Sequence, residues 1–369
     1  MPTLQSAIDA ASGGVVTLDP TQTYTLEEGK PAKITTGGLR IRGRGARVIK
    51  DTREYPSLVI FADGVRVEGV RFEGAAPPNL LTPMPQSFTG TTLPAISLSL
   101  PFSTNRYDCG WAQVVTAGDS ICLHRCTFTG ATGVHMLPHR DGRRARNNCA
   151  TWCRFFDYTF GFIVYGQERL TLQRTYGERP LQPTTSFGPL AVQDGLAPGH
   201  LIYLAPGTGP AAAISAEECW CDDVLINHVI ERVGSATPIT TLYTTIKANN
   251  VHGLRIGNVR SVGIPSCLDF LGCSGYAWNI DQQDGMMEDD PNQWATFRWA
   301  IVKENGALKQ YQRDSGTMTI ENARFAPEGG NVRLYRSERP GLTLRSVTFE
   351  NVELHDDPLI LPDSTPVIQ

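Results

Sequence analysis

Apolar residues recur along this chain in a short pattern that covers most of its length. In residues 318–325 they alternate with polar ones for three positions, the alternation slips by one position, and it then resumes. The same pattern occurs at residues 65–72, 121–128, 170–177, 224–231, 254–261 and 342–349, with weaker copies from residue 39 and at 148–155. A helix would need apolar residues three and four positions apart, whereas alternation is typical of strands. Each copy therefore predicts two short strands joined by a bend.

The bend falls at the fifth position of a copy, where the residues tolerate turn or left-handed backbone conformations. They are Gly69, Asn258, Asn322 and Ser346. One copy cannot bury its own apolar face, so equivalent copies must stack as parallel coils. Copies that start at 148 and 170, or at 224 and 254, are 22 and 30 residues apart, which fits one turn. The larger gaps, from 65 to 121, 170 to 224 and 254 to 318, are 56, 54 and 64 residues and predict two turns each.

The first residues predict a cap on one end of this solenoid. Thr3 can begin a short helix whose apolar face includes Leu4 and Ile8, and Gly13-Gly14 ends it. The stretch LQSAIDAASGGVVTLDPTQTYTL resembles the opening of right-handed β-helix proteins of the pectate-lyase-like superfamily, in which a helix caps the open first coil. The recurring copies extend the resemblance over most of the chain, which is also similar to the β-helices of phage tailspikes and depolymerases.

The resemblance implies an all-β chain, a single-stranded right-handed parallel β-helix with a short N-terminal capping helix. We expect residues 1–30 to form the cap, residues 31–352 the β-helix and residues 353–369 an extended C-terminal tail. Loop insertions are expected at about 75–110, which is rich in Pro, Ser and Thr, and at 279–293, where an acidic run interrupts the pattern. The acidic run lacks the ligand spacing of a calcium loop.

Size and charge narrow the class of protein further. With 369 residues, of which 41% are hydrophobic and 19% charged, the chain can bury the core of one elongated domain. A net charge of -4 argues against nucleic acid as a partner. No stretch approaches the roughly 20 apolar residues that span a bilayer, and the first residues lack the features of a secretion signal. We therefore expect synthesis in a host cytoplasm, with secretion after removal of a signal as the alternative.

Nine cysteines are an odd number, so they cannot all pair within one chain. Cys122 and Cys149 occupy the outward second position of consecutive copies, and Cys126 and Cys153 occupy the inward sixth position. Neighbouring coils lie about 4.8 Å apart, so either pair could form a disulfide, whereas unpaired inward thiols would be ordinary core residues. The slip at the bend sends the members of each Cys-x-x-x-Cys to opposite sides. We therefore expect no zinc, and no other metal or cofactor.

Four candidate catalytic residues lie in segments expected to be neighbouring strands. Lys247 and Asp269 are single charges in apolar runs, which favours outward positions. If their strands are adjacent, the two lie within reach of one another and of His200 or Tyr203. Elimination from a uronic acid needs such a cation and a base. A plain salt bridge is the alternative.

Hydrolysis of a glycosidic bond would instead need two carboxylates on either side of that bond. The candidates are Asp222 with Asp223, or Asp194 with Asp269. The paired-Asp and Gly-His-Gly motifs that the resemblance would imply for polygalacturonase-type hydrolases are absent from the sequence. The sequence is compatible with a lyase, with a hydrolase and with a protein that is not an enzyme.

A basic cluster at residues 139–146 adds candidates for binding an acidic sugar. Guanidinium groups bind carboxylates through two parallel hydrogen bonds. The candidate substrate-binding residues are Arg140, Arg143, Arg144, Arg146 and, further along the chain, His252. A solvated loop tip is the alternative.

The shape expected of a solenoid indicates a function. Long shallow grooves with side chains in register suit linear polymers, so the expected ligand is a polysaccharide. The resemblance to tailspikes, which are usually trimers, implies a phage or phage-derived virion spike that forms a homotrimer or attaches to other virion proteins. The alternatives are a free bacterial polysaccharide lyase or glycoside hydrolase, and a purely structural virion protein.

Overall fold

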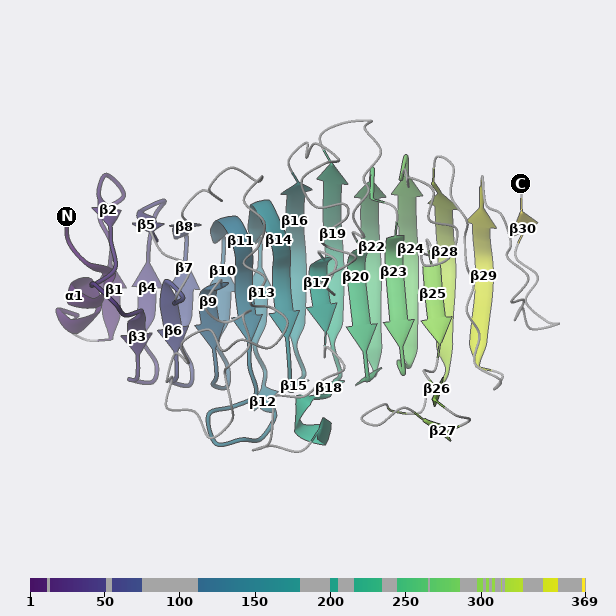
Figure 1. Cartoon of the computed structure of the whole chain (residues 1–369), viewed down its shortest axis with the longest axis horizontal. Coiled ribbons are helices and arrows are strands. Elements are labelled where there is room, and N and C mark those ends of the chain that lie inside the picture. Colours follow the sequence, from purple (N-terminus) through teal and green to yellow (C-terminus); the bar gives the residue numbers. More distant parts are fainter. Residues whose placement is uncertain are drawn as a thin grey trace.

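The structure is a computed structural model that describes residues 1–11, 14–50, 55–74, 112–179, 200–204, 216–233, 244–264, 266–285, 297–300, 303–304, 307–308, 313, 316–327, 341–350 and 367–368. Its strands stack in parallel along one axis, with the N-terminal helix at one end and β30 at the other (Figure 1). The predicted right-handed parallel β-helix is confirmed. Among the described residues, no helix has the length and apolar character needed to cross a membrane.

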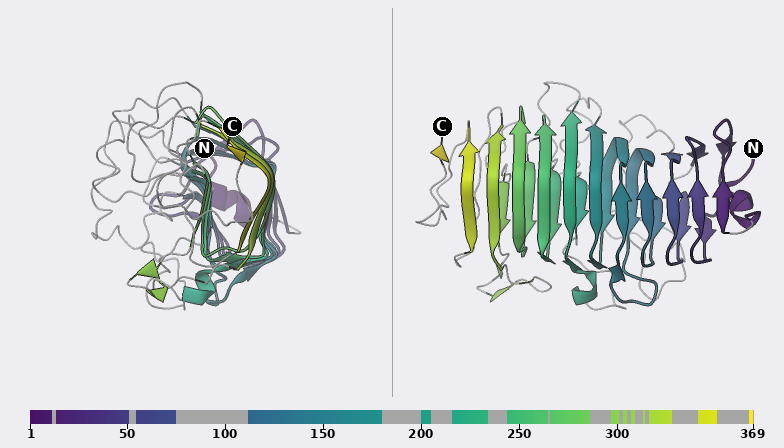
Figure 2. Two further views of the ribbon diagram at one scale, coloured as in Figure 1. Left: turned by 90° about the vertical axis from the view of Figure 1, so that its right-hand side faces the viewer. Right: turned by 180° about the vertical axis from the view of Figure 1, so that it is seen from behind.

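Each coil crosses three faces of the solenoid, which we call faces 1, 2 and 3 in the order of β3, β4 and β5 along the chain. Viewed along the axis, successive coils overlie one another and outline a single cross-section (Figure 2). Face 1 contains β3 (Ala32–Ile34), β6 (Leu58–Ile60), β9 (Ala112–Thr116), β17 (His200–Leu204), β20 (Thr244–Asn249), β23 (Ser266–Leu271) and β25 (Phe297–Ala300).

Shorter strands build the first coils of faces 2 and 3. Face 2 contains β1 (Val15–Thr17), β4 (Arg40–Arg42), β7 (Arg66–Glu68), β10 (Cys122–His124) and β13 (Cys149–Thr151). Face 3 contains β2 (Thr23–Tyr24), β5 (Arg47–Ile49), β8 (Arg71–Glu73) and, at the far end, β30 (Val367–Ile368).

Longer strands turn a corner and belong to two faces. β11 (Thr127–Met136) and β14 (Arg154–Val164) run from face 3 into face 1. From face 2 into face 3 run β16 (Thr171–Arg179), β19 (Leu225–Val233), β22 (Leu254–Val262), β24 (Gly275–Gln283), β28 (Met318–Ala326) and β29 (Leu342–Phe349).

A small parallel sheet lies at the corner between faces 1 and 2. It consists of β12 (Ala145–Arg146), β15 (Gln167–Glu168), β18 (Cys221–Asp222) and β21 (Val251–His252). The remaining elements are a short helix, η2 (Ala216–Cys219), and an antiparallel pair, β26 (Lys303–Glu304) and β27 (Ala307–Leu308).

The predicted cap is present as α1 (Leu4–Asp9). Thr3 begins the helix, since its Oγ1 accepts a hydrogen bond from the Ser6 amide at 3.0 Å. Leu4 is buried in the core, and its amide donates to the Thr25 carbonyl at 2.9 Å. The helix therefore covers the apolar end of the first coil and is tied to it by the backbone.

The predicted bend is the corner between faces 2 and 3. Its backbone is left-handed, with φ of 66° at Gly69, 54° at Asn258, 52° at Asn322 and 51° at Ser346. The equivalent residues of other coils are Arg125, Trp152, Arg174, His228 and Asn279. Three of the asparagines form a ladder along this corner. Asn322 donates to Asn279 at 2.7 Å, and Asn279 donates to Asn258 at 3.0 Å.

Inward side chains of the three faces form one continuous apolar core. Aromatic rings stack along face 3 in two groups, Phe72, Phe128 and Phe155 near the start and Phe325 with Phe349 near the end. Between them the same column is polar. The fully buried Glu231 accepts a hydrogen bond from Tyr158 at 2.6 Å. Gly177 makes room for this contact, because a Cβ there would lie 2.2 Å from the Tyr158 hydroxyl.

Two of the three large gaps contain one turn, so the expectation of two turns was wrong for them. β7 pairs directly with β10, and β16 pairs directly with β19. An insertion can leave the stack and return without changing the register, so a gap's length does not report the number of turns. The gap from 254 to 318 does contain two turns, and the copy that the pattern missed is β24.

The expected insertions coincide only in part with what the structure describes. Residues 75–110 lie outside the described residues, as do residues 286–293. The insertion expected from residue 279 begins later, because Asn279 to Gln283 belong to β24, where Ile280 is buried and Asp281 faces outward. Most of the expected tail, 353–369, is also outside the described residues, but β30 pairs in parallel with β29.

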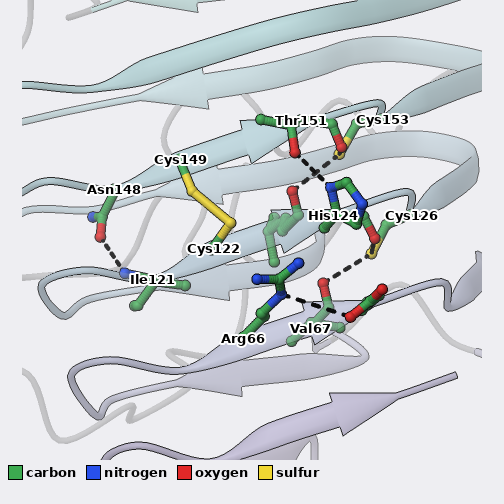
Figure 3. The surroundings of a disulfide bond; sticks show 12 residues. Arg66, Val67, Ile121, Cys122, His124, Cys126, Asn148, Cys149, Thr151 and Cys153 are labelled. Atoms are coloured by element: carbon green, nitrogen blue, oxygen red, sulfur yellow. Dashed lines mark hydrogen bonds and ion pairs between the residues drawn. A yellow bond between two sulfur atoms is a disulfide. The ribbon is translucent and has the colours of Figure 1, made fainter.

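The outward cysteines Cys122 and Cys149 form a disulfide across face 2, with their Cα atoms 4.7 Å apart (Figure 3). The inward pair, Cys126 and Cys153, is unbridged and fully buried. Burial raises the pKa of the Cys126 thiol to about 11, so it stays protonated as an ordinary core residue. The opposite orientation of Cys122 and Cys126 agrees with the prediction from the slip at the bend.

Candidate functional site

Three of the candidate catalytic residues lie side by side on face 1. Tyr203 of β17 is the register partner of Lys247 on β20, which is in turn the partner of Asp269 on β23. The Lys247 Nζ lies 3.3 Å from the Asp269 carboxylate and 5.6 Å from the centre of the Tyr203 ring. We call Tyr203, Lys247 and Asp269 the polar row. The condition set by the sequence, that these strands be neighbours, is met.

His200 lies beside the polar row, in contact with Tyr203 of the same strand, β17. Its ring packs edge-on against Tyr203 at 4.7 Å and against Phe160 at 5.7 Å. His200 is fully buried. On the other side of Tyr203, Asn249 donates a hydrogen bond to the phenol oxygen at 3.4 Å. Tyr203 is therefore held between a histidine and an amide, with its ring facing the ammonium of Lys247.

The polar row is largely removed from water. Side-chain exposure is 13% for Lys247 and 3% for Asp269. On the preceding coils the same outward column contains Val115, His135 and Ile163, which are all fully buried. A low-dielectric surrounding strengthens the attraction between the two charges and makes either charge costly alone. Such a buried pair of opposite charges is a recognised feature of functional sites as well as of structural ones.

The arginines of the basic cluster are paired with carboxylates of the protein itself. Arg140 binds Asp63 through two hydrogen bonds of 2.7 and 3.0 Å, and Arg143 binds Asp119 at 3.1 and 2.8 Å. Hydrogen bonding by Arg140 holds the pKa of Asp63 well below its ordinary value. These guanidinium groups already have the bidentate partner that an acidic sugar would supply.

Arg144 and Arg146 are also paired with carboxylates, each through one hydrogen bond. Arg146 donates to Glu168 at 2.9 Å, while Arg144 contacts the Asp222 carboxylate. Asp222 also accepts from Arg313 at 2.5 Å. Asp222 is therefore neutralised by two guanidinium groups at the corner sheet, where His252 is its register partner.

Among the described carboxylates proposed for hydrolysis, Asp223 does not join the polar row. Asp223 follows Asp222 at the corner sheet in a left-handed conformation. Asp194 lies outside the described residues. In the described part of the chain, no three His, Cys, Asp or Glu side chains are grouped as they would be around a metal ion.

An open groove on face 3 escaped the sequence analysis. It measures about 670 Å³ and is lined by Trp152, Arg154, Phe156, Arg174, Thr175, Tyr176, His228 and Ile230. We call it the aromatic groove. Trp152 and Ile230 are 42% and 45% exposed, unusually high for large apolar side chains. The sequence contained one feature that could have predicted this groove: Tyr176 and Ile230 occupy the same outward position of consecutive copies of the pattern.

Comparisons with known proteins bear on the fold. No family model matches the chain, and no curated protein matches its sequence. The A-module of the mannuronan C-5 epimerase AlgE6 of Azotobacter vinelandii is similar in structure at 10% identity, with a TM-score of 0.53 over 99% of this chain and 93% of that module.

Two further solved structures are similar at lower scores. An alginate lyase from Paenibacillus sp. str. FPU-7 has 11% identity and a TM-score of 0.43 over 94% of this chain and 97% of the lyase. The tailspike protein of E. coli bacteriophage HK620, solved in complex with a pentasaccharide, has 12% identity and a TM-score of 0.47 over 99% of this chain and 60% of the tailspike.

The fold defines the class of the protein. The chain is a parallel β-helix, as the cap and the recurring pattern predicted. By their names, the similar structures include an epimerase of mannuronan, a lyase of alginate and a tailspike bound to an oligosaccharide. At these levels of identity the likeness establishes the fold, and any activity has to be argued from the side chains.

Proposed function

We propose that this chain recognises a polysaccharide containing uronic acid and that the polar row on face 1 is where a uronic acid residue reacts. The observation that carries the proposal is the placement of a phenol, an ammonium and a carboxylate on three successive coils, with Lys247 Nζ 3.3 Å from Asp269 and 5.6 Å from the Tyr203 ring. A polymer lying along the solenoid axis would meet the three groups in turn.

Elimination is the reaction that these groups support best. The C5 proton of a uronic acid moves to a base, a double bond forms between C4 and C5, and the glycosidic oxygen leaves and takes up a proton. The ammonium of Lys247 would neutralise the sugar carboxylate, which makes the C5 proton removable. Tyr203 and His200 are the candidates for the base, and Asp269 positions Lys247.

Hydrolysis has weaker support. It requires two carboxylates about 5 to 9.5 Å apart around the bond to be cleaved. Of the nominated carboxylates that the structure describes, Asp269 lies on face 1, whereas Asp222 is bound by Arg144 and Arg313 at the corner sheet. A lyase is therefore preferred to a glycoside hydrolase.

Incubation with polysaccharides tests this proposal. We expect a subset of acidic polymers, such as alginate, polygalacturonate or a bacterial capsule, to yield unsaturated products that absorb in the ultraviolet. New reducing ends should appear in equal number, because each elimination releases one chain end. Reducing ends without ultraviolet absorbance would identify a hydrolase and contradict the proposal, as would silence on every acidic polymer offered.

The biological setting is also a proposal. A virion spike, assembled as a homotrimer or on other virion proteins, fits a solenoid that displays long faces to a polymer, and a secreted bacterial enzyme is the alternative. Neither the virion nor the trimer follows from the side chains of the polar row. The sedimentation measurement described below reports directly on assembly.

A further inference from the structure

We propose that the aromatic groove on face 3 is a second polysaccharide-binding surface, separate from the polar row, and that it takes a sugar that carries a negative charge. The proposal takes its ligand class from the proposed function and adds a site to it. Face 3 and face 1 are different sides of each coil, so the groove cannot be a subsite immediately next to the polar row.

The aromatic groove runs along the solenoid axis across three coils. Its outward residues come from β14, β16 and β19, which pair in parallel so that Arg154, Tyr176 and Ile230 form one column. Trp152, Arg174 and His228, the left-handed residues of the same coils, form the parallel wall at the bend. With coils about 4.8 Å apart, the groove extends about 10 Å along the direction that a linear polymer would follow.

Aromatic and aliphatic surface gives the groove its floor. Phe156 and Tyr176 lie 5.9 Å apart with their rings tilted, and Trp152 stands across from them at the bend. Exposed aromatic side chains offer a large, rigid apolar contact at little cost in side-chain entropy. The apolar face of a sugar ring can lie on such a surface while its hydroxyl groups stay in water.

The groove contains two exposed guanidinium groups, those of Arg154 and Arg174. Neither forms an ion pair within the part of the chain that the structure describes. Arg174 instead lies over the Trp152 ring at 4.3 Å. Elsewhere on face 3, Arg47 and Arg324 are each bound bidentately by a glutamate of the neighbouring coil.

Glu178, the register partner of the groove residue Phe156, is already neutralised. Glu178 accepts hydrogen bonds from the Tyr176 hydroxyl and from Arg232, and these hydrogen bonds lower its pKa. It therefore adds little repulsion toward an anion. The two unpaired guanidinium groups leave the groove with a local positive charge, although the whole chain carries -4.

A second copy of the chain is a poorer occupant than an anionic glycan. A two-fold interface through this groove would set Arg154 and Arg174 against the same residues of the other copy. Like charges brought together at an interface oppose association. A carboxylate on a sugar would instead receive the paired hydrogen bonds that guanidinium groups form best.

Matched substitutions test the proposal. Arg154→Gln and Arg324→Gln each remove one positive charge from the same outward column of face 3, but Arg324 is already bound by Glu350. We expect Arg154→Gln to weaken binding of alginate or polygalacturonate oligosaccharides about tenfold, measured by calorimetry at low salt, and Arg324→Gln to leave it unchanged. Trp152→Ala should weaken binding at least as much, with thermal unfolding confirming that the variants are folded.

The outcomes separate this proposal from the proposed function. Lys247→Ala should retain binding at the groove, since the two sites are on different faces. If Arg154→Gln loses binding and no variant cleaves the polymer, the groove is supported as a binding surface and the proposed enzymatic activity is contradicted. Equal effects of Arg154→Gln and Arg324→Gln, or no effect of Trp152→Ala, would overturn the groove. So would a wild-type oligomer in sedimentation that becomes a monomer in Trp152→Ala, because the occupant would then be a second copy.

Discussion

Lys247→Ala is expected to abolish formation of unsaturated products from uronate polymers, with a loss of at least about a hundredfold in kcat/KM. The ammonium is the cation of the polar row placed to neutralise the sugar carboxylate. The substitution also removes the ammonium that lies 3.3 Å from the Asp269 carboxylate, whose side chain is 3% exposed. Removal of one member of a buried ion pair costs about 3 to 5 kcal/mol of folding stability, so the thermal midpoint should fall as well.

A second variant separates the loss of chemistry from the loss of stability. In Lys247→Met/Asp269→Leu both charges are replaced by apolar groups, which is often nearly neutral for stability. We expect this variant to be as inactive as Lys247→Ala and to unfold close to the wild-type temperature. Product formation at the wild-type rate by the double variant would show that the pair is a structural salt bridge and would end the assignment of chemistry to face 1.

Phe155→Ala should give the largest loss of stability from a single apolar side chain. Phe155 is fully buried, stacks on Phe128 at 5.0 Å and packs edge-on against Phe162 at 4.8 Å, so that it joins faces 3 and 1. Truncation of a buried phenylalanine costs about 3 to 5 kcal/mol, because the surroundings fill the cavity incompletely. Chemical denaturation, followed by circular dichroism, measures the difference.

The neighbouring residue provides the control. Phe156→Ala removes the same side chain from the outer surface, where it lines the aromatic groove, and should change stability by less than about 1 kcal/mol. Its effect should appear in glycan binding instead. If Phe156→Ala and Phe155→Ala destabilise the protein equally, the assignment of inward and outward positions on β14 is wrong.

Much of the fold could be predicted from the sequence because burial in a solenoid repeats with every coil. The slip in the alternation placed the left-handed bend correctly at Gly69, Asn258, Asn322 and Ser346. It also separated the outward Cys122 from the inward Cys126. The number of coils was harder to predict, because β24 departs from the pattern: Gly275 is at the register position of Leu254 and Met318, and Gln282 is at that of Phe325.

The candidate site could be predicted only in part. Lys247 and Asp269 could be nominated from the sequence because they are single charges in apolar runs. That they are register partners could not be predicted, because insertions of unequal length separate the strands along the chain. The partners of Arg140 and Arg143, which are Asp63 and Asp119, come from earlier coils and cannot be paired with them by spacing along the chain. The aromatic groove was missed because each of its residues is unremarkable within its own copy.

The most direct test of the account is a comparison of acidic and neutral glycans of the same length. Calorimetric titration of the wild-type protein with alginate or polygalacturonate oligosaccharides, and with neutral maltooligosaccharides, at low and at physiological salt, measures affinity and its dependence on charge. We predict that the acidic oligosaccharides bind at least about tenfold more tightly and that salt weakens them selectively. Equal or tighter binding of the neutral oligosaccharides, or no binding of any acidic one at low salt, would contradict the account.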